Sequence, residues 1–276
     1  MNNIPMLSAR RTAAFRGTVY DYYKRHGRNL PWRETTDAYR ILVSEVMLQQ
    51  TQVPRVLLKY KEFLDRFPHV AALAAAPLRH VLSVWQGLGY NRRALMLKQA
   101  AEEIVAHRNG IVPRDEKGLV SLPGIGPATA RAVMAFAFNE PVILIETNIR
   151  AVFIHHFFTG EEPVPDSALV PLIEKTIDRK NPGKWYNALM DYGTFLKQVH
   201  ANPARRSAHH QRQSPFEGSV RQIRGAIIRL ILEKVNVSPG DIIQGLPFDD
   251  HTVSETLDQL EREGIIAAKM GYISIA

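Results

Sequence analysis

The chain has 276 residues, of which 45% are hydrophobic and 22% charged, an ordinary globular composition that excludes a disordered chain. It contains no cysteine, which excludes disulfides, iron–sulfur clusters, thiolate metal sites and cysteine nucleophiles. The net charge of +8 favours a polyanionic partner. The basic excess lies in residues 1–217, because residues 218–276 hold six Lys and Arg against eight Asp and Glu.

The sequence gives no sign of a membrane segment. Its longest apolar runs, among them residues 132–138, have seven residues, whereas a membrane span needs roughly 20. The first residues, MNNIPMLSARR, lack the apolar core of a secretory signal. We therefore expect a cytoplasmic protein, associated with the nucleoid in a prokaryote, with no membrane partner.

Up to residue 200 the apolar residues recur at helical spacing, and many segments begin after Pro, Asp or Ser and end near Gly or Pro. No convincing run of strands precedes residue 260. The pattern predicts an all-α body, with helices at 37–50, 53–67, 77–84, 92–107, 128–138, 149–158, 168–177 and 185–199.

The last part of the chain has a different organisation. Residues 201–215 are polar and basic without an apolar period, which predicts a loop or linker. Three helices and two short strands are then predicted, at 219–235, 238–244, 252–263, 265–268 and 272–275. This order suggests a small winged-helix-like domain. Its third helix carries four acidic residues and one Arg, the wrong charge for a DNA groove, so we expect a structural role or a protein partner.

Two glycines one residue apart mark a tight connection between helices. Gly124 and Gly126 lie in LPGIGPATA, and the absence of Cβ atoms lets a ligand approach the backbone closely. The amides that begin the following helix favour an anion such as a DNA phosphate. The alternative interpretation is an ordinary interhelical turn.

Two carboxylates stand in partly apolar surroundings. Glu146 follows an apolar run and precedes Asn148 and a helix, and it either serves chemistry or complements the helix dipole. Glu45 lies between hydrophobic residues, where desolvation would suit it to general-acid work, and the alternative is an exposed helix terminus. The polar residues Gln49, Gln50 and Thr51 follow at the helix end.

Together these segments resemble the helix-hairpin-helix DNA glycosylases, the superfamily of endonuclease III and of the MutY adenine glycosylases. The resemblance covers roughly residues 28–193 and rests on LPWR, TDAYRILVSEVMLQQTQV, WQGLGYNRRA, LPGIGPATA and ETNIR. It implies a six-helix barrel domain at 31–137 and a second helical domain formed from 1–30 and 138–200. A basic linker at 201–217 and the winged-helix-like domain at 218–276 would follow.

The resemblance also implies residue roles. Glu45 would protonate the departing base, Glu146 would stabilise the positively charged sugar, and Asn148 would assist beside it. The target base would be flipped out of the duplex, and two carboxylates flanking a glycosidic bond suit the chemistry. The expected DNA- and base-binding residues are Arg33, Gln49, Gln50, Thr51, Tyr90, Asn91, Leu122, Gly124, Gly126, Ala128, Thr129, Arg205 and Arg206. No metal is expected on side chains, but Na⁺ or K⁺ is expected at the hairpin carbonyls of Leu122 and Gly124.

The sequence departs from the family in several places. Glu146 stands where the family usually has Asp, and Ala128 stands where strand-cleaving members have a Schiff-base Lys. The basic loop with Arg205 and Arg206 replaces a four-cysteine cluster loop, so no iron–sulfur cofactor is expected. The Nudix-like domain typical of MutY is missing, and Asn91 replaces a second aromatic residue.

The sequence therefore predicts a monomeric, monofunctional DNA glycosylase of base excision repair without efficient lyase activity. The expected partner is double-stranded DNA with a damaged or mispaired base. The leading expected substrate is adenine opposite guanine or 8-oxoguanine. The alternatives are excision of uracil or thymine opposite guanine or of hypoxanthine, a non-catalytic binder of damaged DNA, and a transcription regulator that reads DNA with its C-terminal domain.

Overall fold

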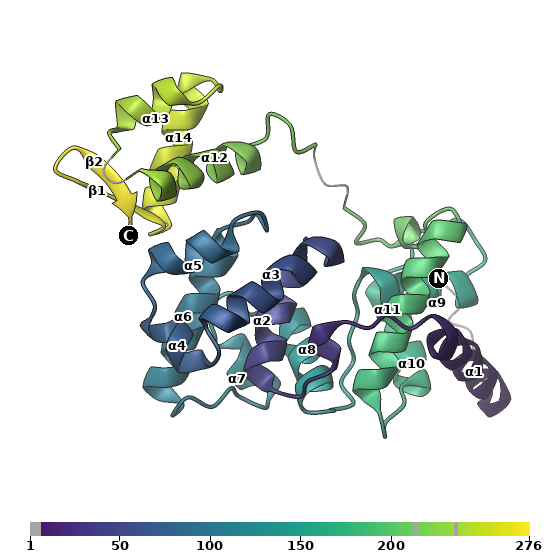
Figure 1. Cartoon of the computed structure of the whole chain (residues 1–276). Helices are drawn as coiled ribbons and strands as arrows, with labels where there is room; N and C mark the ends of the chain where they lie inside the picture. Colours follow the sequence, from purple (N-terminus) through teal and green to yellow (C-terminus); the bar gives the residue numbers. More distant parts are fainter. Residues whose placement is uncertain (1–6, 212–214, 235–236) are drawn as a thin grey trace. The chain divides into compact units, whose positions relative to one another are not determined.

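The computed structural model describes residues 7–211, 215–234 and 237–276. Its described part is mostly helical, with a single two-stranded sheet near the C-terminus, which confirms the predicted all-α body (Figure 1). The chain divides into two compact units, residues 1–41, 114–116 and 126–212 in the first and 42–113, 117–125 and 213–276 in the second. None of the described helices has the length and apolar character to cross a membrane.

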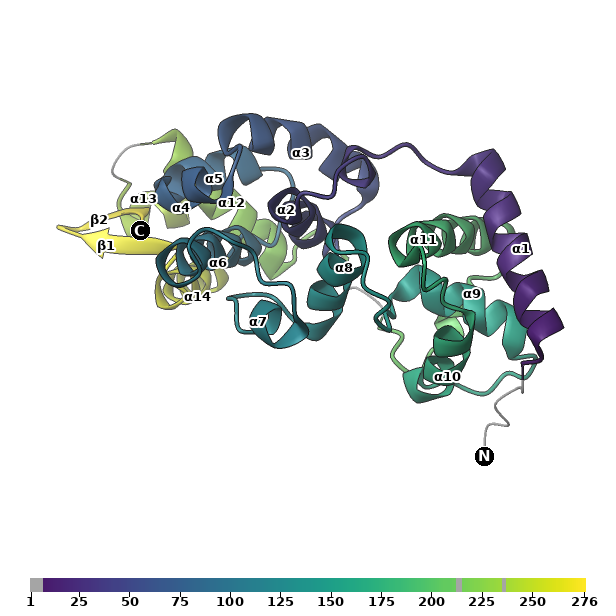
Figure 2. The ribbon, with the colours of Figure 1, turned by 90° about the horizontal axis from the view of Figure 1, so that it is seen from below.

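The first unit is built around a core of aromatic residues. Phe15 of α1 packs against Phe157 of α9 and Trp185 of α11, with ring centroids 4.9 and 5.9 Å away. These helices lie side by side in both ribbon views (Figures 1 and 2). The elements of this unit are α1 (Ala9–His26), η1 (Pro31–Arg33), α8 (Pro127–Ala137), α9 (Thr147–Phe157), α10 (Asp166–Thr176), α11 (Pro182–Val199) and η2 (Pro203–Arg206).

The second unit contains a group of shorter helices packed around Phe63 and Trp85, whose ring centroids are 5.9 Å apart. Its helices before residue 126 are α3 (Val53–Arg66), α4 (Val70–Ala75), α5 (Leu78–Trp85), α6 (Arg92–His107) and α7 (Glu116–Val120). Helix α2 (Ala38–Leu48) begins in the first unit and runs into the second. Phe63 and Trp85 are fully buried, so this unit has an apolar core of its own.

The second unit also includes the C-terminal segment. Helix α12 (Val220–Glu233) buries Ile223, Ile227 and Ile231, a spacing of one helical turn that explains its formation. Then come α13 (Pro239–Gly245), α14 (Asp250–Arg262), β1 (Ile266–Lys269) and β2 (Tyr272–Ile275), and the two strands pair antiparallel. The order of elements is the predicted one, and the assignment to the winged-helix class stays a prediction.

The units do not follow the predicted domain boundaries in every place. Helix α8, expected in the barrel domain, packs against α11 of the first unit. Residues 213–276 group with the second unit instead of standing apart. The helices α1 and α4 were not predicted, because each offers only two buried apolar side chains: Phe15 and Val19 in α1, Val70 and Leu73 in α4.

Residues 203–207 are packed and are not a solvated linker. Pro203, Ala204 and Ser207 are buried, and Ser207 forms an isolated parallel bridge with Val164. In the rest of the predicted linker Asn202 is half-buried and the other described residues are exposed. Residues 212–214 lie outside the described part, as does Val235, the last residue of the helix predicted at 219–235.

Candidate active site

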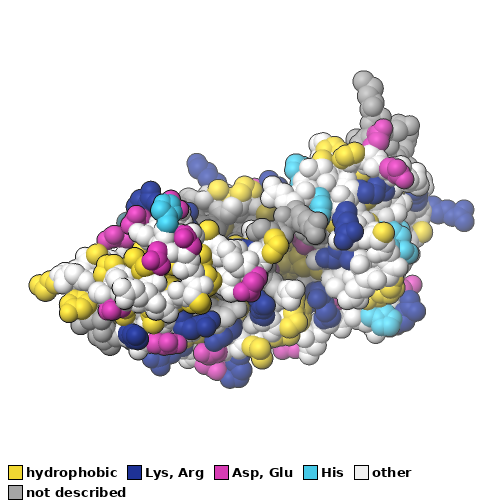
Figure 3. All heavy atoms as spheres, turned by 90° about the horizontal axis from the view of Figure 1, so that it is seen from above, with side chains coloured by type: hydrophobic (Ala, Val, Ile, Leu, Met, Phe, Trp, Pro, Cys, Tyr) yellow, Lys and Arg dark blue, Asp and Glu magenta, His cyan; other side chains and the backbone are white. Residues whose placement is uncertain are grey.

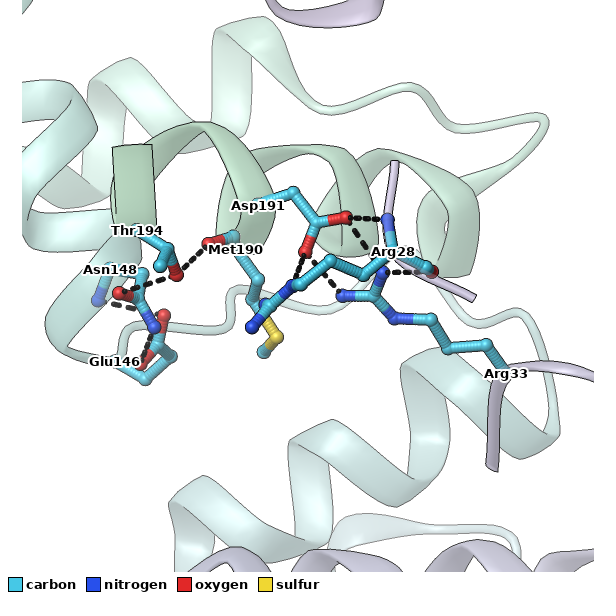
Figure 4. Close-up of polar contacts among 7 residues, drawn as sticks. All are labelled: Arg28, Arg33, Glu146, Asn148, Met190, Asp191 and Thr194. Atoms are coloured by element: carbon cyan, nitrogen blue, oxygen red, sulfur yellow. Dashed lines mark hydrogen bonds and ion pairs between the residues drawn. The ribbon is translucent and has the colours of Figure 1, made fainter. Parts of the chain in front are cut away.

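Glu146 caps the N-terminus of α9 with its own side chain. One carboxylate oxygen accepts from the backbone amides of Asn148 and Ile149 at 2.8 and 3.1 Å, and the other accepts from the Asn148 side-chain amide at 3.2 Å (Figure 4). A carboxylate held by three N–H donors at a helix N-terminus has one defined orientation. The extra methylene of Glu relative to Asp is taken up as the side chain folds back on its own helix.

Asn148 lies directly against α11. A Cβ added to Gly193 would be only 2.3 Å from the Asn148 carbonyl oxygen, so only glycine permits this approach of the two helices. The next residue, Thr194, donates from its hydroxyl to the Met190 carbonyl at 2.8 Å, and the same hydroxyl lies 3.4 Å from the Asn148 side-chain oxygen, a long hydrogen bond (Figure 4). Helix α11 therefore fixes the residue that holds Glu146.

The extended segment before Glu146 is anchored by Tyr186 of α11. The Tyr186 hydroxyl donates to the Val142 carbonyl at 2.6 Å and accepts from the Leu144 amide at 3.1 Å. Burial raises the pKa of Tyr186 to about 12, so the phenol stays neutral and keeps both hydrogen bonds. Two contacts from one side chain set the path of the chain into the site.

Asp191 forms the centre of a buried ion cluster. Its carboxylate, 2% exposed, accepts a bidentate pair from Arg33, both bonds at 2.8 Å, and two bonds from Arg28, one of them from the backbone amide (Figure 4). Burial raises the pKa of Asp191, but the hydrogen bonds from Arg33 and Arg28 outweigh it and hold the pKa below the usual value. The Arg33 side chain is 8% exposed, so this predicted DNA-binding residue is engaged within the first unit.

Glu45 lies on α2, half-buried, one turn before the helix ends at Leu48. The residues that follow it, Gln49 and Thr51, are half-buried, and Gln50 is exposed with a φ of +54°. A positive φ is uncommon for a residue with a side chain and marks a tightly held turn. Glu45 and Glu146 belong to different compact units.

Arg93 holds the end of α2 in place. Its guanidinium donates to the carbonyls of Val46 and Met47 at 2.9 Å, to that of Gln49, and to the Thr51 hydroxyl at 2.9 Å. A cation at the last carbonyls of a helix is favoured by the helix dipole. Burial lowers the pKa of Arg93 to about 10, so it remains cationic at neutral pH.

The same guanidinium also orders the loop of the predicted residue Tyr90. It donates to the carbonyls of Leu88 and Gly89 and lies 5.3 Å from the centre of the Tyr90 ring. Tyr90 has a φ of +48°, and its hydroxyl accepts from Arg221 of α12 at 2.9 Å. Asn91, half-buried, is the N-cap position of α6, but its side chain makes no capping bond.

The predicted hairpin is present between α7 and α8. Leu122 is buried, and its carbonyl accepts from the Ile125 amide at 3.2 Å. Gly124 has a φ of +75°, and a Cβ there would lie 2.6 Å from Cβ of Met96. Gly126 is the exposed N-cap of α8, where no side chain caps the helix, and the exposed Ala128 and half-buried Thr129 follow. The first turn of α8 therefore presents backbone amides that suit an anion.

The basic loop contributes one exposed and one packed arginine. Arg205 is exposed, whereas Arg206 is half-buried and donates to the Phe158 carbonyl at 2.8 Å. Within the described ranges no group of three or more His, Asp or Glu side chains is placed to hold a metal ion. Figure 3 shows Lys and Arg side chains spread over one face in small groups.

The structure brings several predicted residues together within the second unit. A cavity of about 690 Å³ is lined by Gln49, Gln50, Tyr90, Asn91 and Gly124. In the first unit, Glu146 and Asn148 are in direct contact. Sequence reasoning missed Arg93, Tyr186, Asp191 and Gly193 as positioning residues, although the sequence places Arg93 three residues after Tyr90, and Asp191 and Gly193 inside MDYG.

Comparison with known proteins places this geometry in a family. Residues 43–170 match the family described as HhH-GPD superfamily base excision DNA repair protein. The matched segment contains Glu45, Arg93, the hairpin and Glu146, so it includes residues of both compact units.

Similar curated proteins carry the name adenine DNA glycosylase. That of Buchnera aphidicola subsp. Baizongia pistaciae is 35% identical over 67% of this chain and 53% of its own length. The Mycobacterium tuberculosis protein is 46% identical over 48% of this chain and 43% of its own length. The human protein is 34% identical over 66% of this chain and 36% of its own length. The chain spans about half the length of the curated relatives it matches.

Solved structures share the fold over more of the chain. A thermostable thymine-DNA glycosylase has a TM-score of 0.59 and 25% identity, covering 67% of this chain and 86% of the other. A trapped endonuclease III–DNA covalent intermediate has a TM-score of 0.54 and 21% identity, covering 76% and 92%, which shows a shared fold.

Proposed function

We propose that this protein is a DNA N-glycosylase of base excision repair that removes adenine mispaired with guanine or 8-oxoguanine. The observation that carries this proposal is the Glu146 carboxylate, fixed by Asn148 and the start of α9, in a segment that also contains Glu45. The name of the relatives, adenine DNA glycosylase, supports adenine as the base. The binding partner would be double-stranded DNA.

The reaction divides between the two carboxyl groups. Glu45 would donate a proton to the departing base as the bond between the base nitrogen and sugar C1′ breaks. Glu146, unable to turn away because three N–H donors hold it, would face the positive charge that develops on the sugar. Water then adds at C1′ and returns a proton to a carboxylate, which leaves an abasic site.

Strand cleavage is not part of the proposed reaction. A glycosylase that also cleaves the strand forms a Schiff base between an enzyme amine and sugar C1′. The exposed Ala128 occupies the position where the resemblance places that amine. We expect abasic sites that remain intact until alkali or another enzyme cleaves them.

DNA would be held through the hairpin. The N-terminus of α8, where Gly126 supplies no capping side chain, offers the backbone amide of Ala128 to a phosphate. A monovalent cation on the carbonyls of Leu122 and Gly124 remains part of the proposal, as do a monomeric state and a protein partner for the C-terminal module.

A second candidate substrate is thymine or uracil opposite guanine. A thymine-DNA glycosylase structure shares the fold over 86% of its length, and Glu146 departs from the Asp usual among the MutY adenine glycosylases. The chemistry at the carboxylates would be unchanged, and only recognition of the base would differ.

The test is single-turnover release of bases from a duplex panel, followed by alkali. The panel holds adenine opposite 8-oxoguanine and guanine, thymine and uracil opposite guanine, and hypoxanthine. We expect adenine release, and a rate at least ~10²-fold lower in Glu45→Gln, because general-acid catalysis is lost while DNA binding is kept. Glu146→Gln keeps the hydrogen-bond acceptor but removes the charge and should also be slow.

The matched control is Glu62→Gln, an exposed glutamate on α3 paired with Lys59. Its rate should equal that of the wild type. Release of thymine or uracil alone would establish the second candidate. DNA binding without release of any base would contradict an enzyme and favour a protein that only binds damaged DNA.

A further inference from the structure

Helix α12 of the C-terminal segment lies against the segment that contains the predicted base-probing residues. Near its N-terminus, Arg221 donates to the Tyr90 hydroxyl at 2.9 Å. At its C-terminus, the Ile231 and Leu232 carbonyls accept from Arg79 of α5 at 3.1 and 2.6 Å. A guanidinium at the last carbonyls of a helix is favourable, so both ends of α12 are tied within the second unit.

The 690 Å³ cavity is lined by α12, by the loop of Gln49 and Gln50, and by the loop of Tyr90. Its volume lies within the roughly 300–1,000 Å³ typical of small-molecule sites. The residues that line the cavity include Gln49, Gln50 and Asn91, whose side-chain amides can both donate and accept hydrogen bonds. The apolar part is lined by Ile125 and Ile228. Amides beside an apolar wall suit the edge and the face of a nucleobase.

The cavity is also strongly cationic. Besides Arg221, its lining includes Arg55, Arg92 and Arg229, all three exposed. None of the carboxylates in the described residues forms an ion pair with these three guanidinium groups. The one acidic lining residue, Glu263, is already neutralised by Arg224 through two hydrogen bonds, at 3.1 and 2.5 Å. Uncompensated arginines around a cavity favour phosphate.

The aromatic ring of Tyr90 lies beside two guanidinium groups. The Arg221 guanidinium carbon lies 5.7 Å from the centre of its ring, and Arg93 lies 5.3 Å away. Arg93 donates to backbone carbonyls, and Arg221, which lines the cavity from α12, donates to the Tyr90 hydroxyl and to the Pro215 carbonyl at 3.2 Å. Bases that have left the duplex stack can stack on aromatic rings and on guanidinium planes.

From this arrangement we propose that α12 and the loops of Gln49–Gln50 and Tyr90 form one binding site for an unpaired nucleotide of the DNA duplex. Arg221 and Arg229 of α12 contact its phosphates, and this contribution of α12 goes beyond the base-binding loops that the resemblance implies. The inference rests on the proposed function and assigns DNA contacts to a module expected, from its acidic helix α14, to be structural. The basic helix of that module is α12.

The test uses the full chain and a short labelled duplex with a tetrahydrofuran abasic analogue opposite guanine. The affinity is measured over a series of salt concentrations. For Arg221→Ala combined with Arg229→Ala, we expect the slope of log affinity against log salt to fall by about 2, one for each lost phosphate contact. Arg229→Ala alone should lower the slope by about 1, and because Arg229 is exposed it should not disturb folding.

The control pair is Arg262→Ala with Lys269→Ala, two exposed cations of the same module that do not line the cavity. It removes the same net charge and should leave the slope unchanged. Equal slopes for the two double variants, with a thermal unfolding midpoint like that of the wild type, would overturn the proposal.

A second readout reports the base itself. With 2-aminopurine opposite the abasic analogue, binding should raise its fluorescence, because the base leaves the stack, and Arg221→Ala should lose most of that rise. No rise with the wild type would also overturn the site. Slope and fluorescence changes without base release in any duplex would sustain the site and contradict the glycosylase proposal, so the two failures are distinguishable.

Discussion

Arg93 is the residue on which two loops of the candidate site depend. Its guanidinium joins the end of α2 to the Leu88 and Gly89 carbonyls and has the Tyr90 ring at 5.3 Å. Its role could not be predicted from the sequence, because its partners lie up to 47 residues away and are backbone carbonyls, which any residue type supplies. By contrast, Glu45 and Glu146 could be proposed as candidates from the sequence, because the apolar residues next to them in the sequence indicate partly apolar surroundings.

We expect Arg93→Met to lower the free energy of unfolding by about 3 kcal/mol, because several buried carbonyls lose a charged donor. The free energy of unfolding of Arg93→Lys should lie between those of the wild type and Arg93→Met, since an ammonium cannot reach all the acceptors of a planar guanidinium. Urea unfolding followed by circular dichroism measures both values. Arg92→Met, at the exposed neighbouring position, is the control, and equal losses for positions 92 and 93 would refute this role.

At the scale of elements, the hairpin contains two glycines with different duties. Gly124 needs its positive φ and the space beside Met96, whereas Gly126 has a φ of −84° and open space around its missing Cβ. The sequence located the hairpin through these two residues, but it did not distinguish them. The distinction depends on Met96, which comes from another helix.

We predict that Gly124→Ala lowers the free energy of unfolding by about 2 kcal/mol, through backbone strain and the clash with Met96. Gly126→Ala should fold with near wild-type stability, yet bind DNA more weakly, because its methyl group would face the phosphate proposed at the start of α8. Thermal unfolding and DNA titration of both variants test this. A stable Gly124→Ala would show that the turn tolerates a side chain.

The long helices were predicted well because each buries a regular apolar face. Helix α6 has the predicted limits, and the predicted helices of the other long segments begin and end close to the observed ones. The interpretation of 201–215 was incomplete for a physical reason. Pro203 and Ala204 are buried by contact with α9 and α11, and no periodic pattern announces such a short turn.

At the scale of the whole molecule, His156 makes stability depend on pH. Burial first, and the neighbouring His155 second, lower the pKa of His156 to about 4. As the pH falls, His156 of the unfolded chain takes up a proton near the ordinary histidine pKa of ~6.5, whereas His156 of the folded chain does so only at lower pH. Stability is therefore complete above that pH and is lost as the pH falls toward 4.

We expect the free energy of unfolding to fall by about 2 kcal/mol between pH 7 and 4, a value discounted because His156 is only partly buried. His156→Gln can still bond the Tyr192 hydroxyl, which lies 3.0 Å from Nε2 in the wild type, but cannot titrate. Its stability should depend less on pH over this range. His80→Gln, an exposed position on α5, should behave like the wild type; identical profiles for all three proteins would refute the prediction.

The division of the chain has a consequence for how this protein can be inherited. Neither compact unit is a continuous stretch, because the chain changes unit after residues 41, 113, 116, 125 and 212. A single break in the backbone cannot release one unit whole. Exchange of one complete unit would therefore need several crossovers within the gene, because a single crossover cannot separate the whole of one unit from the whole of the other.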